Sequence, residues 1–251
     1  MAILYVASEA AELEPMAKLL TGVRKLKWPL AYAYEGVLEG RRLLLAANGA
    51  GPKLAVRAVE VAIRAITSAD LSSSALEAVV STGFCGALDP ALRESQIVLA
   101  NEVLDWANKE RYDCVQIAEG TAAVPGLVVS QDRIAIDGEE KRCLREGSGA
   151  AVVEMEAAGV AARVKRAGLP FCCIKVILDR ADESFPIDWN KMRNAEGRIA
   201  RGKIVIRAVT RPNLLPGLFR LKRRSDEAAR VLGEFLVSCR ISPNVNSARA
   251  E

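Results

Sequence analysis

Runs of apolar residues alternate with amphipathic segments along most of the chain. The run at 2–8 is typical of a buried strand, and the segment at 9–20 carries apolar residues at helical spacing. Residues 32–40 and 41–51 predict two strands joined by a turn at Glu39-Gly40, and a helix should begin at Pro52. Further strands are expected within 76–88, where a strand should run into a small-residue loop, and within 94–106, 126–135 and 171–178.

The same pattern predicts a helix after Met155 and a long basic helical region from about residue 191. Pro212 and Pro216 should break that region into at least two helices, because proline removes a helical hydrogen bond. Strands that alternate with helices predict an α/β fold of three layers, with a largely parallel or mixed central sheet. We expect one domain over 1–239, which includes the basic region 191–239, and a polar tail over 240–251.

The composition is that of an ordinary globular protein, so it says little about the class of protein and more about the chemistry that is available. The chain has 251 residues, of which 51% are hydrophobic and 26% charged, and no apolar run reaches the ~20 residues that span a bilayer. The first residues lack a basic segment, so we expect a cytoplasmic protein. The six cysteines show no ligand-like spacing and read as buried thiols.

Histidine is absent from the sequence. This excludes Ser-His-Asp and Cys-His catalysis and any metal site that needs an imidazole, and we expect no bound metal. Acid–base chemistry must therefore come from carboxylates, Lys, Tyr or Cys. The stretch 152–182 supplies acids at the edges of apolar runs: Glu154 and Glu156 before a helix, and Asp179 and Asp182 after a strand. Burial at such positions makes ionisation costly, which points to a function for some of them.

Three segments resemble the nucleoside phosphorylase / nucleosidase superfamily: "STGFCGALDPAL" at 81–92, "GAAVVEMEAAGVA" at 149–161 and "FCCIKVILDRADE" at 171–183. Each motif alone is weak, but their order and spacing, together with Glu12 after the first strand, make the likeness specific. It covers about residues 2–190. It implies a phosphorylase-like fold, whose mixed and partly barrel-like central sheet is flanked by helices, and a homo-oligomer.

The resemblance assigns three catalytic carboxyls. Glu156 would accept hydrogen bonds from the ribose hydroxyls, with Met155 packed on the sugar, and Asp179 would act as general acid toward the purine N7. Glu12 would position and activate an attacking water. Breaking an N-glycosidic bond builds positive charge on the sugar and negative charge on the base, so a carboxylate and a protonated carboxyl suit the two ends. Glu154 and Asp182 read as structural.

Several positions depart from the family pattern. In the loop motif, Phe84 replaces the Ser of the family, and Ser81 stands where some family members have an Arg. Ile134 replaces the aromatic residue that stacks on the base in the family. Leu178 replaces the Ser or Thr that precedes the catalytic aspartate. The backbone N–H groups of Gly83, Cys85 and Gly86 could still be donors to an anion, and Gly83 and Gly86 are expected to contact the substrate. The loss of cationic donors disfavours inorganic phosphate as co-substrate, although the end of the chain favours it. The acceptor, phosphate or water, therefore stays open.

The C-terminal region carries thirteen Lys/Arg against four Asp/Glu over 191–240. It is similar to the end of the hopanoid-associated phosphorylase group, which is linked to cleavage of adenine from the lipid nucleoside adenosylhopane. Leucines and a phenylalanine interleave with cations over 211–224, as they do in helices that lie on a membrane surface. We therefore expect peripheral contact with the membrane through 211–224, or alternatively a helix with a solvated basic face.

Two other classes of function stay open. The chain could be an inactive nucleoside-binding module, although such a module has no need of Glu12, Glu156 and Asp179 together. A basic nucleic-acid binder fits the C-terminal charge, but only Phe219 lies between 191 and 230 to interleave with the cations. We therefore expect a small-molecule nucleoside as the partner, no nucleic acid, and no cofactor other than phosphate as a co-substrate.

Overall fold

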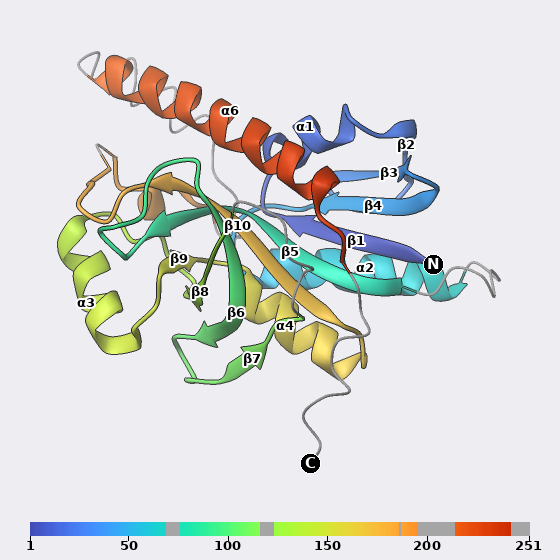
Figure 1. The fold of residues 1–251 in the computed structure, drawn as a ribbon, viewed down its shortest axis with the longest axis horizontal. Coiled ribbons are helices and arrows are strands. Elements are labelled where there is room, and N and C mark those ends of the chain that lie inside the picture. Colours follow the sequence, from blue (N-terminus) through green and yellow to red (C-terminus); the bar gives the residue numbers. More distant parts are fainter. Residues whose placement is uncertain (69–75, 116–122, 186, 195–213, 242–251) are drawn as a thin grey trace.

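The structure, a computed structural model, describes residues 1–68, 76–115, 123–185, 187–194 and 214–241. A ten-stranded mixed sheet forms its centre (Figure 1). The strands are β1 (Ala2–Ala7), β2 (Thr21–Lys25), β3 (Tyr32–Leu38), β4 (Arg41–Ala47), β5 (Leu76–Ala87), β6 (Ile97–Asp105), β7 (Arg111–Asp113), β8 (Ala123–Ser130), β9 (Val152–Glu154) and β10 (Phe171–Asp179). The helices are α1 (Ala10–Ala17), α2 (Pro52–Ser68), α3 (Gly138–Ser148), α4 (Ala157–Arg166), the 3₁₀ helix η1 (Trp189–Met192) and α6 (Leu215–Ser238).

Half of the sheet closes on itself. Strand β5 pairs in parallel with β10, β10 pairs antiparallel with β6, and β6, β8 and β9 lead back to β5. The other half extends from β5 through β1, β4 and β3 to the edge strand β2. This confirms the expected mixed and partly barrel-like sheet. It also makes β5 the strand shared by the closed and the open half.

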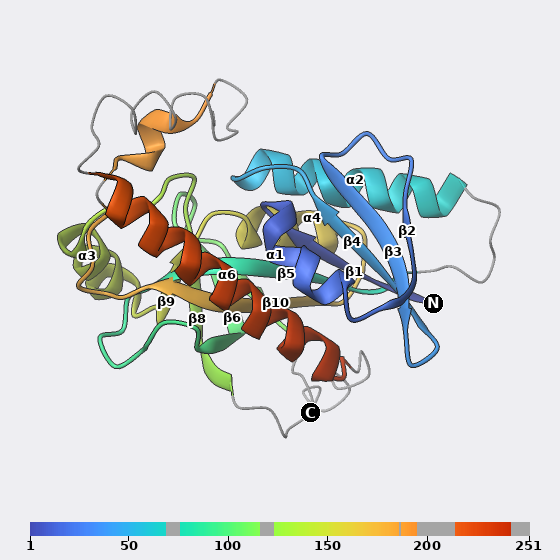
Figure 2. The same cartoon turned by 90° about the horizontal axis from the view of Figure 1, so that it is seen from above.

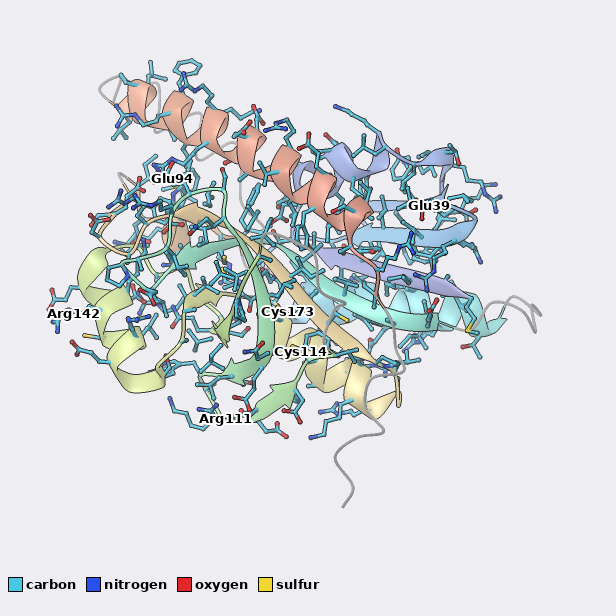
Figure 3. All side chains as sticks on the ribbon, viewed as in Figure 1. Glu39, Glu94, Arg111, Cys114, Arg142 and Cys173 are labelled. Atoms are coloured by element: carbon cyan, nitrogen blue, oxygen red, sulfur yellow. The ribbon has the colours of Figure 1, made fainter. Side chains whose placement is uncertain are left out.

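Helices cover both faces of the sheet, as Figure 2 shows from above. Helices α2 and α4 pack against one face, where they share a core with the alternate side chains of β1, β4 and β5. Helices α1 and α6 pack against each other and against the opposite face. The predicted three layers are therefore present. Cys114 and Cys173 lie in the interior between them, as predicted for buried thiols (Figure 3), and Cys85 and Cys172 are buried too. The prediction was wrong for Cys143, which is exposed, and for Cys239, which is only partly buried.

Three details of the expected element pattern were wrong. The predicted loop after 81 is instead the second half of β5, because β10 pairs with that strand from Val79 to Gly86 and keeps its backbone extended. Helix α3 had not been predicted at all. Pro216 does not break a helix but lies in the first turn of α6, where its missing N–H costs no hydrogen bond. Pro212 and the tail from 242 lie outside the described residues.

None of the helices in the described part of the chain is both long and apolar enough to cross a membrane.

Helices α1 and α6 approach closely at Gly233. A Cβ atom added there would lie 2.7 Å from the backbone nitrogen of Met16 and 3.0 Å from the carbonyl carbon of Pro15. Backbone atoms cannot move aside as a side chain can, so only glycine allows this distance between the helices. The position of α6 over the sheet therefore depends on Gly233.

Gly233→Val should lower the free energy of unfolding by about 1–3 kcal/mol, because the larger side chain forces the two helices apart. For a chain of this size each kcal/mol lowers the melting temperature by about 2–4 °C, which thermal unfolding monitored by circular dichroism can measure. Glu234→Ala, at the adjacent exposed position, is the matched control and should change stability by less than about 0.5 kcal/mol. Equal stability of Gly233→Val and the control would contradict this account of the packing.

Candidate active site

A cavity of about 430 Å³ lies where β1, β9 and β10 end and where the second half of β5 passes between them. Its wall is apolar over most of its area, but five carboxyl groups reach it. The lining residues are Ser8, Glu9, Ala11, Glu12, Ala50, Phe84, Cys85, Gly86, Arg133, Ile134, Ala135, Val153, Glu154, Met155, Glu156, Leu178, Asp179, Phe185, Trp189, Leu221 and Ser225. All three predicted catalytic carboxyls are therefore on one cavity.

Glu12 is fixed by its own turn and by the sheet. It lies in the first turn of α1, where its Oε2 accepts hydrogen bonds from Ser8 Oγ at 2.8 Å and from the backbone N–H of Glu9 at 2.7 Å. Its Oε1 accepts from the backbone N–H of Phe84 at 2.7 Å. The side chain is buried, so these donors replace the water that a carboxylate would otherwise bind.

Gly83, predicted to contact substrate, instead lies behind Glu12 and is not one of the lining residues. Its φ of 118° lies in the region that favours glycine, and a Cβ there would fall 2.4 Å from Glu12 Oε1. The backbone N–H of Phe84, the next residue, is donated to Glu12. Gly83 therefore serves to admit the carboxylate.

Glu156 directly precedes α4 and accepts a hydrogen bond at 2.7 Å from the backbone N–H of Gly51, in the loop between β4 and α2. Burial raises the pKa of this carboxyl to about 8, the charge of Glu154 adds to the rise, and Lys175 opposes it. Its neighbour Met155 lines the cavity as predicted. The side chain therefore faces the cavity with a single backbone donor and a strong tendency to hold a proton.

Glu154, read as structural from the sequence, supports Glu156 from behind. Its carboxylate accepts hydrogen bonds from the backbone N–H groups of Glu156 and Ala157 at 2.9–3.0 Å, at the start of α4. Lys175 Nζ lies 2.8 Å from Glu154 Oε2 and also donates to the Thr82 carbonyl. Burial opposes the charge on Lys175, but Glu154, Cys173 and Glu156 together outweigh it, so the pKa of the lysine is raised. The pair carries a formal charge of zero.

Asp179 ends β10 at the opposite side of the cavity. Lys141 of α3 donates a short hydrogen bond to its Oδ2, and Gly86 lies against the carboxyl on the other side. Burial raises the pKa of Asp179 to about 6, although the charge of Lys141 lowers it. Desolvation therefore raises the pKa of Asp179, as predicted. The sequence had not indicated that a cation, Lys141, contacts this carboxyl.

The remaining predicted contacts line the cavity. Phe84, Gly86 and Ile134 are all on its wall, and the backbone of Ile134 is tied to Asn190 of η1 by two hydrogen bonds. Asp182, read as structural, is exposed and forms an ion pair with Arg180. No group of three or more potential metal ligands is found among the described residues.

Sequence reasoning missed four contributors. Lys141 and Lys175 come from segments distant in sequence from the carboxyls they contact, and a lysine in an apolar strand or a polar helix gives no signal of its own. Leu221 and Ser225 of α6 also line the cavity, although the sequence predicted a membrane-facing or solvated helix there. Because they are four residues apart, they lie on one face of the helix, and this spacing could have indicated that the face is buried.

Comparisons with known proteins found a sequence-family model and relatives that this chain resembles. The sequence model of the phosphorylase superfamily matches residues 114–210. A 5′-methylthioadenosine/S-adenosylhomocysteine nucleosidase of Haemophilus ducreyi is 27% identical over 204 residues, which cover 71% of this chain and 84% of that protein.

Solved structures share the fold. The Neisseria meningitidis 5′-methylthioadenosine/S-adenosylhomocysteine nucleosidase, in complex with methylthio-immucillin-A, matches with a TM-score of 0.66 and 22% identity and covers 94% of this chain and 99% of its own. Futalosine hydrolase of Helicobacter pylori matches with a TM-score of 0.67 and 18% identity and covers 94% and 95%. At these identities the structural likeness establishes the fold.

The raised pKa of Asp179 predicts how stability changes with pH. The folded protein holds the proton up to about pH 6 and the unfolded chain only up to about pH 4, so the folded state binds more protons between these values. This contribution is fully present below about pH 4 and is lost as the pH rises through 6. A shift of two units corresponds to on the order of 3 kcal/mol.

Asp179→Asn, which keeps a neutral side chain of the same shape, should therefore gain stability relative to the unaltered protein as the pH rises from 4 to 8. Urea denaturation at several pH values measures this. Asp182→Asn, an exposed carboxylate in the same turn, is the control and should leave the pH dependence unchanged. A parallel pH dependence for Asp179→Asn and the unaltered protein would show that Asp179 titrates normally.

Proposed function

We propose that this chain, whose residues 114–210 match the sequence model of the phosphorylase superfamily, cleaves the N-glycosidic bond of an adenosine-like nucleoside and that water is the acceptor. The observation that carries this proposal is the convergence of Glu12, Glu156 and Asp179 on one cavity. The curated relative and the structural neighbours described above are nucleosidases and a hydrolase.

The reaction divides among the three carboxyls. The ribose hydroxyls donate to Glu156, which stabilises its carboxylate despite the burial. Glu12, whose carboxyl oxygens accept three hydrogen bonds, orients a water toward C1′ and takes its proton. The C1′–N9 electron pair goes to the base, and Asp179 transfers its proton to N7. Positive charge on the sugar thus develops between two carboxylates, and negative charge on the base is neutralised.

The charge of the cavity supports water over phosphate. Five carboxyls reach the wall, whereas Arg133 is the only positively charged side chain among its described lining residues, and it pairs with Glu140. A phosphate dianion needs several cationic or N–H donors, and the N–H of Phe84 is already used by Glu12. Phosphorolysis remains the alternative reaction, and it leaves ribose 1-phosphate rather than free ribose as product.

The assay incubates the full chain with 5′-methylthioadenosine and adenosine and follows free adenine, with and without inorganic phosphate. We expect adenine release at the same rate in both conditions. Glu156→Gln and Asp179→Asn should each lower turnover by at least ~100-fold, as removal of general acid–base groups does, while the protein stays folded. Asp182→Asn should retain full activity. Release that requires phosphate would overturn the choice of water, and full activity of either active-site variant would remove its assigned role.

We propose a large apolar 5′ substituent on the nucleoside, and the apolar residues Phe185, Trp189 and Leu221 on the cavity wall support this. These residues suit a large apolar 5′ substituent, which extends to a lipid-linked nucleoside such as adenosylhopane. Two apolar residues near Leu221 on α6, Leu215 and Phe219, are exposed, and in Figure 1 the first turns of this helix stand off from the sheet. Residues 211–213 of the expected membrane contact lie outside the described residues.

Peripheral membrane contact through α6 predicts binding to anionic vesicles. The exposed cations Arg220, Lys222 and Arg223 should each contribute about 1 kcal/mol near an anionic surface, and salt should weaken the binding. Co-sedimentation with vesicles of phosphatidylserine and phosphatidylcholine measures it. Phe219→Asp should abolish binding, whereas Val23→Asp, at an exposed apolar site on β2, should not. Absence of salt-sensitive binding by the unaltered protein would end the membrane proposal.

A further inference from the structure

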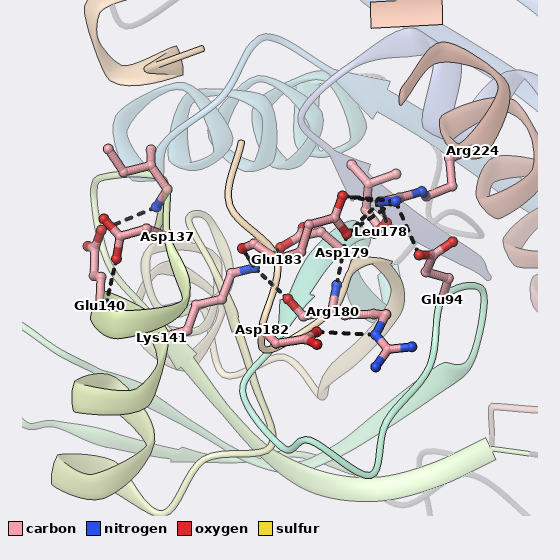
Figure 4. A network of polar contacts seen from close by, with 11 residues as sticks. Glu94, Asp137, Glu140, Lys141, Leu178, Asp179, Arg180, Asp182, Glu183 and Arg224 are labelled. Atoms are coloured by element: carbon pink, nitrogen blue, oxygen red, sulfur yellow. Dashed lines mark hydrogen bonds and ion pairs between the residues drawn. The ribbon is translucent and has the colours of Figure 1, made fainter. Parts of the chain in front are cut away.

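Lys141 is a buried cation in a helix that is otherwise polar and largely exposed. Its side chain is 1% exposed, and its Nζ donates to Asp179 Oδ2, to the carbonyl of Arg180 at 2.6 Å and to the carbonyl of Glu183 at 2.9 Å (Figure 4). The ammonium group has three hydrogens, so these acceptors satisfy it completely. It does not itself reach the cavity wall.

Two carbonyls alone do not explain a charged residue at this position. A buried ammonium is strongly disfavoured unless a counter-charge accompanies it, and the only carboxylate that Lys141 contacts among the described residues is Asp179. The lysine and the aspartate are 38 residues apart in sequence and come from different layers of the fold. The contact therefore connects α3 to the end of β10 at the residue proposed to protonate the base.

We propose that Lys141 is the positioning residue of the leaving-group acid: it holds Asp179 through Oδ2 and stabilises the carboxylate that forms as the proton passes to the base. This inference rests on the proposed function, because it concerns the same site.

The geometry fixes Asp179 from several sides. A Cβ at Gly86 would lie 3.0 Å from Asp179 Oδ2 and 3.4 Å from Oδ1, so the carboxyl lies against bare backbone there. The carbonyl after Asp179 accepts from Lys141, and the carbonyl before it, of Leu178, accepts from Arg224 at 3.3 Å. Because Lys141 engages Oδ2, Oδ1 is the oxygen left to carry the proton to substrate.

The proton transfer leaves a charge that Lys141 can stabilise. The O–H bond of Asp179 breaks, an N–H bond forms at N7, and the C1′–N9 electron pair remains on the base. The product is a carboxylate in contact with an ammonium group. A buried site strengthens this attraction relative to water, which makes Asp179 a stronger acid at the moment of transfer.

The charge of Lys141 also limits the pH range in which Asp179 is protonated and able to act as an acid. Burial raises the pKa of Asp179, Lys141 lowers it, Glu183 raises it and Arg224 lowers it, and the result is about 6. The thiol of Cys85, on the facing strand β5, is buried and has its own pKa raised, so it stays neutral. Lys141 is thus the cation in direct contact with the carboxyl, and its removal should keep Asp179 protonated to higher pH.

The test compares Lys141→Met with Arg142→Met in the full chain. Arg142 is the adjacent residue of α3, and its exposed side chain points away from the site and pairs with Glu146 (Figure 3). With 5′-methylthioadenosine, Lys141→Met should lower kcat ~10–100-fold, change KM less than about threefold, and move the alkaline limb of the kcat/KM profile to higher pH. Arg142→Met should leave kcat, KM and the pH profile unchanged. Lys141→Arg, which keeps the positive charge, should return the alkaline limb of the profile to its original pH.

A second substrate separates positioning of the acid from general damage. The leaving group of 4-nitrophenyl β-ribofuranoside needs no proton, so Lys141→Met should cleave it within about threefold of the unaltered rate. Equal losses on both substrates with an unmoved alkaline limb would show a purely structural lysine and overturn the proposal. If Lys141→Met does not fold, Lys141→Gln, which keeps hydrogen-bond donors and loses the charge, replaces it.

Titration of Asp179 by carbon-13 NMR keeps this test independent of the proposed function. The resonance is assigned with Asp179→Asn, and its pKa should be higher in Lys141→Met than in Arg142→Met. If the protein cleaves no nucleoside but this shift is present, the proposed function fails and the control of Asp179 by Lys141 stands. An unchanged pKa overturns the inference whatever the activity.

Discussion

The ion pair of Lys175 and Glu154 is the interaction on which the site depends. Five carboxyls reach one cavity, and their mutual repulsion and burial would oppose folding if nothing compensated them. Lys175 neutralises Glu154 at 2.8 Å, where both side chains are almost completely inaccessible, and this allows Glu154 to accept the backbone N–H groups at the start of α4. The position of Glu156 follows from that helix start. A buried charge that looks structural therefore sets the geometry at the sugar end.

The two ends of the cavity differ in how their acids are supported. At the sugar end Glu156 receives one backbone hydrogen bond and faces a like charge on Glu154, so it ionises readily only when donors from a ligand arrive. At the base end Asp179 contacts a cation directly and titrates near pH 6. Under the proposed function, substrate binding and ionisation of Glu156 would therefore be coupled, whereas the pKa of Asp179 is set by its protein contacts alone. Environment, rather than residue type, gives the two carboxyls different roles.

The sequence predicted those features whose signal is local or carried by an ordered set of motifs. The apolar runs predicted the longer strands of the sheet, and the motifs brought Glu12, Glu156 and Asp179 together. The exposed strand β2 and the three-residue strands β7 and β9 were missed, because none of them is a long apolar run. Helix α3 was missed although Asp137 caps its start and Gly149 ends it in a left-handed conformation, because its polar composition hides the apolar periodicity. The lysines could not be predicted, since their roles depend on contacts between segments distant in sequence.

One face of helix α6 both lines the cavity and contacts the residues around Asp179. Arg224 and Ser225 lie three and four residues after Leu221, so both are on the same side of the helix as Leu221. Leu221 and Ser225 line the cavity, while Arg224 forms ion pairs with Glu183 and Glu94 and donates to the carbonyl that precedes Asp179. The part of the cavity wall formed by Leu221 and Ser225 is thus anchored on the turn that follows Asp179. Under the proposed function, changes at Leu221 or Ser225 would alter which nucleoside fits, because the residue that anchors the helix is a separate one, Arg224.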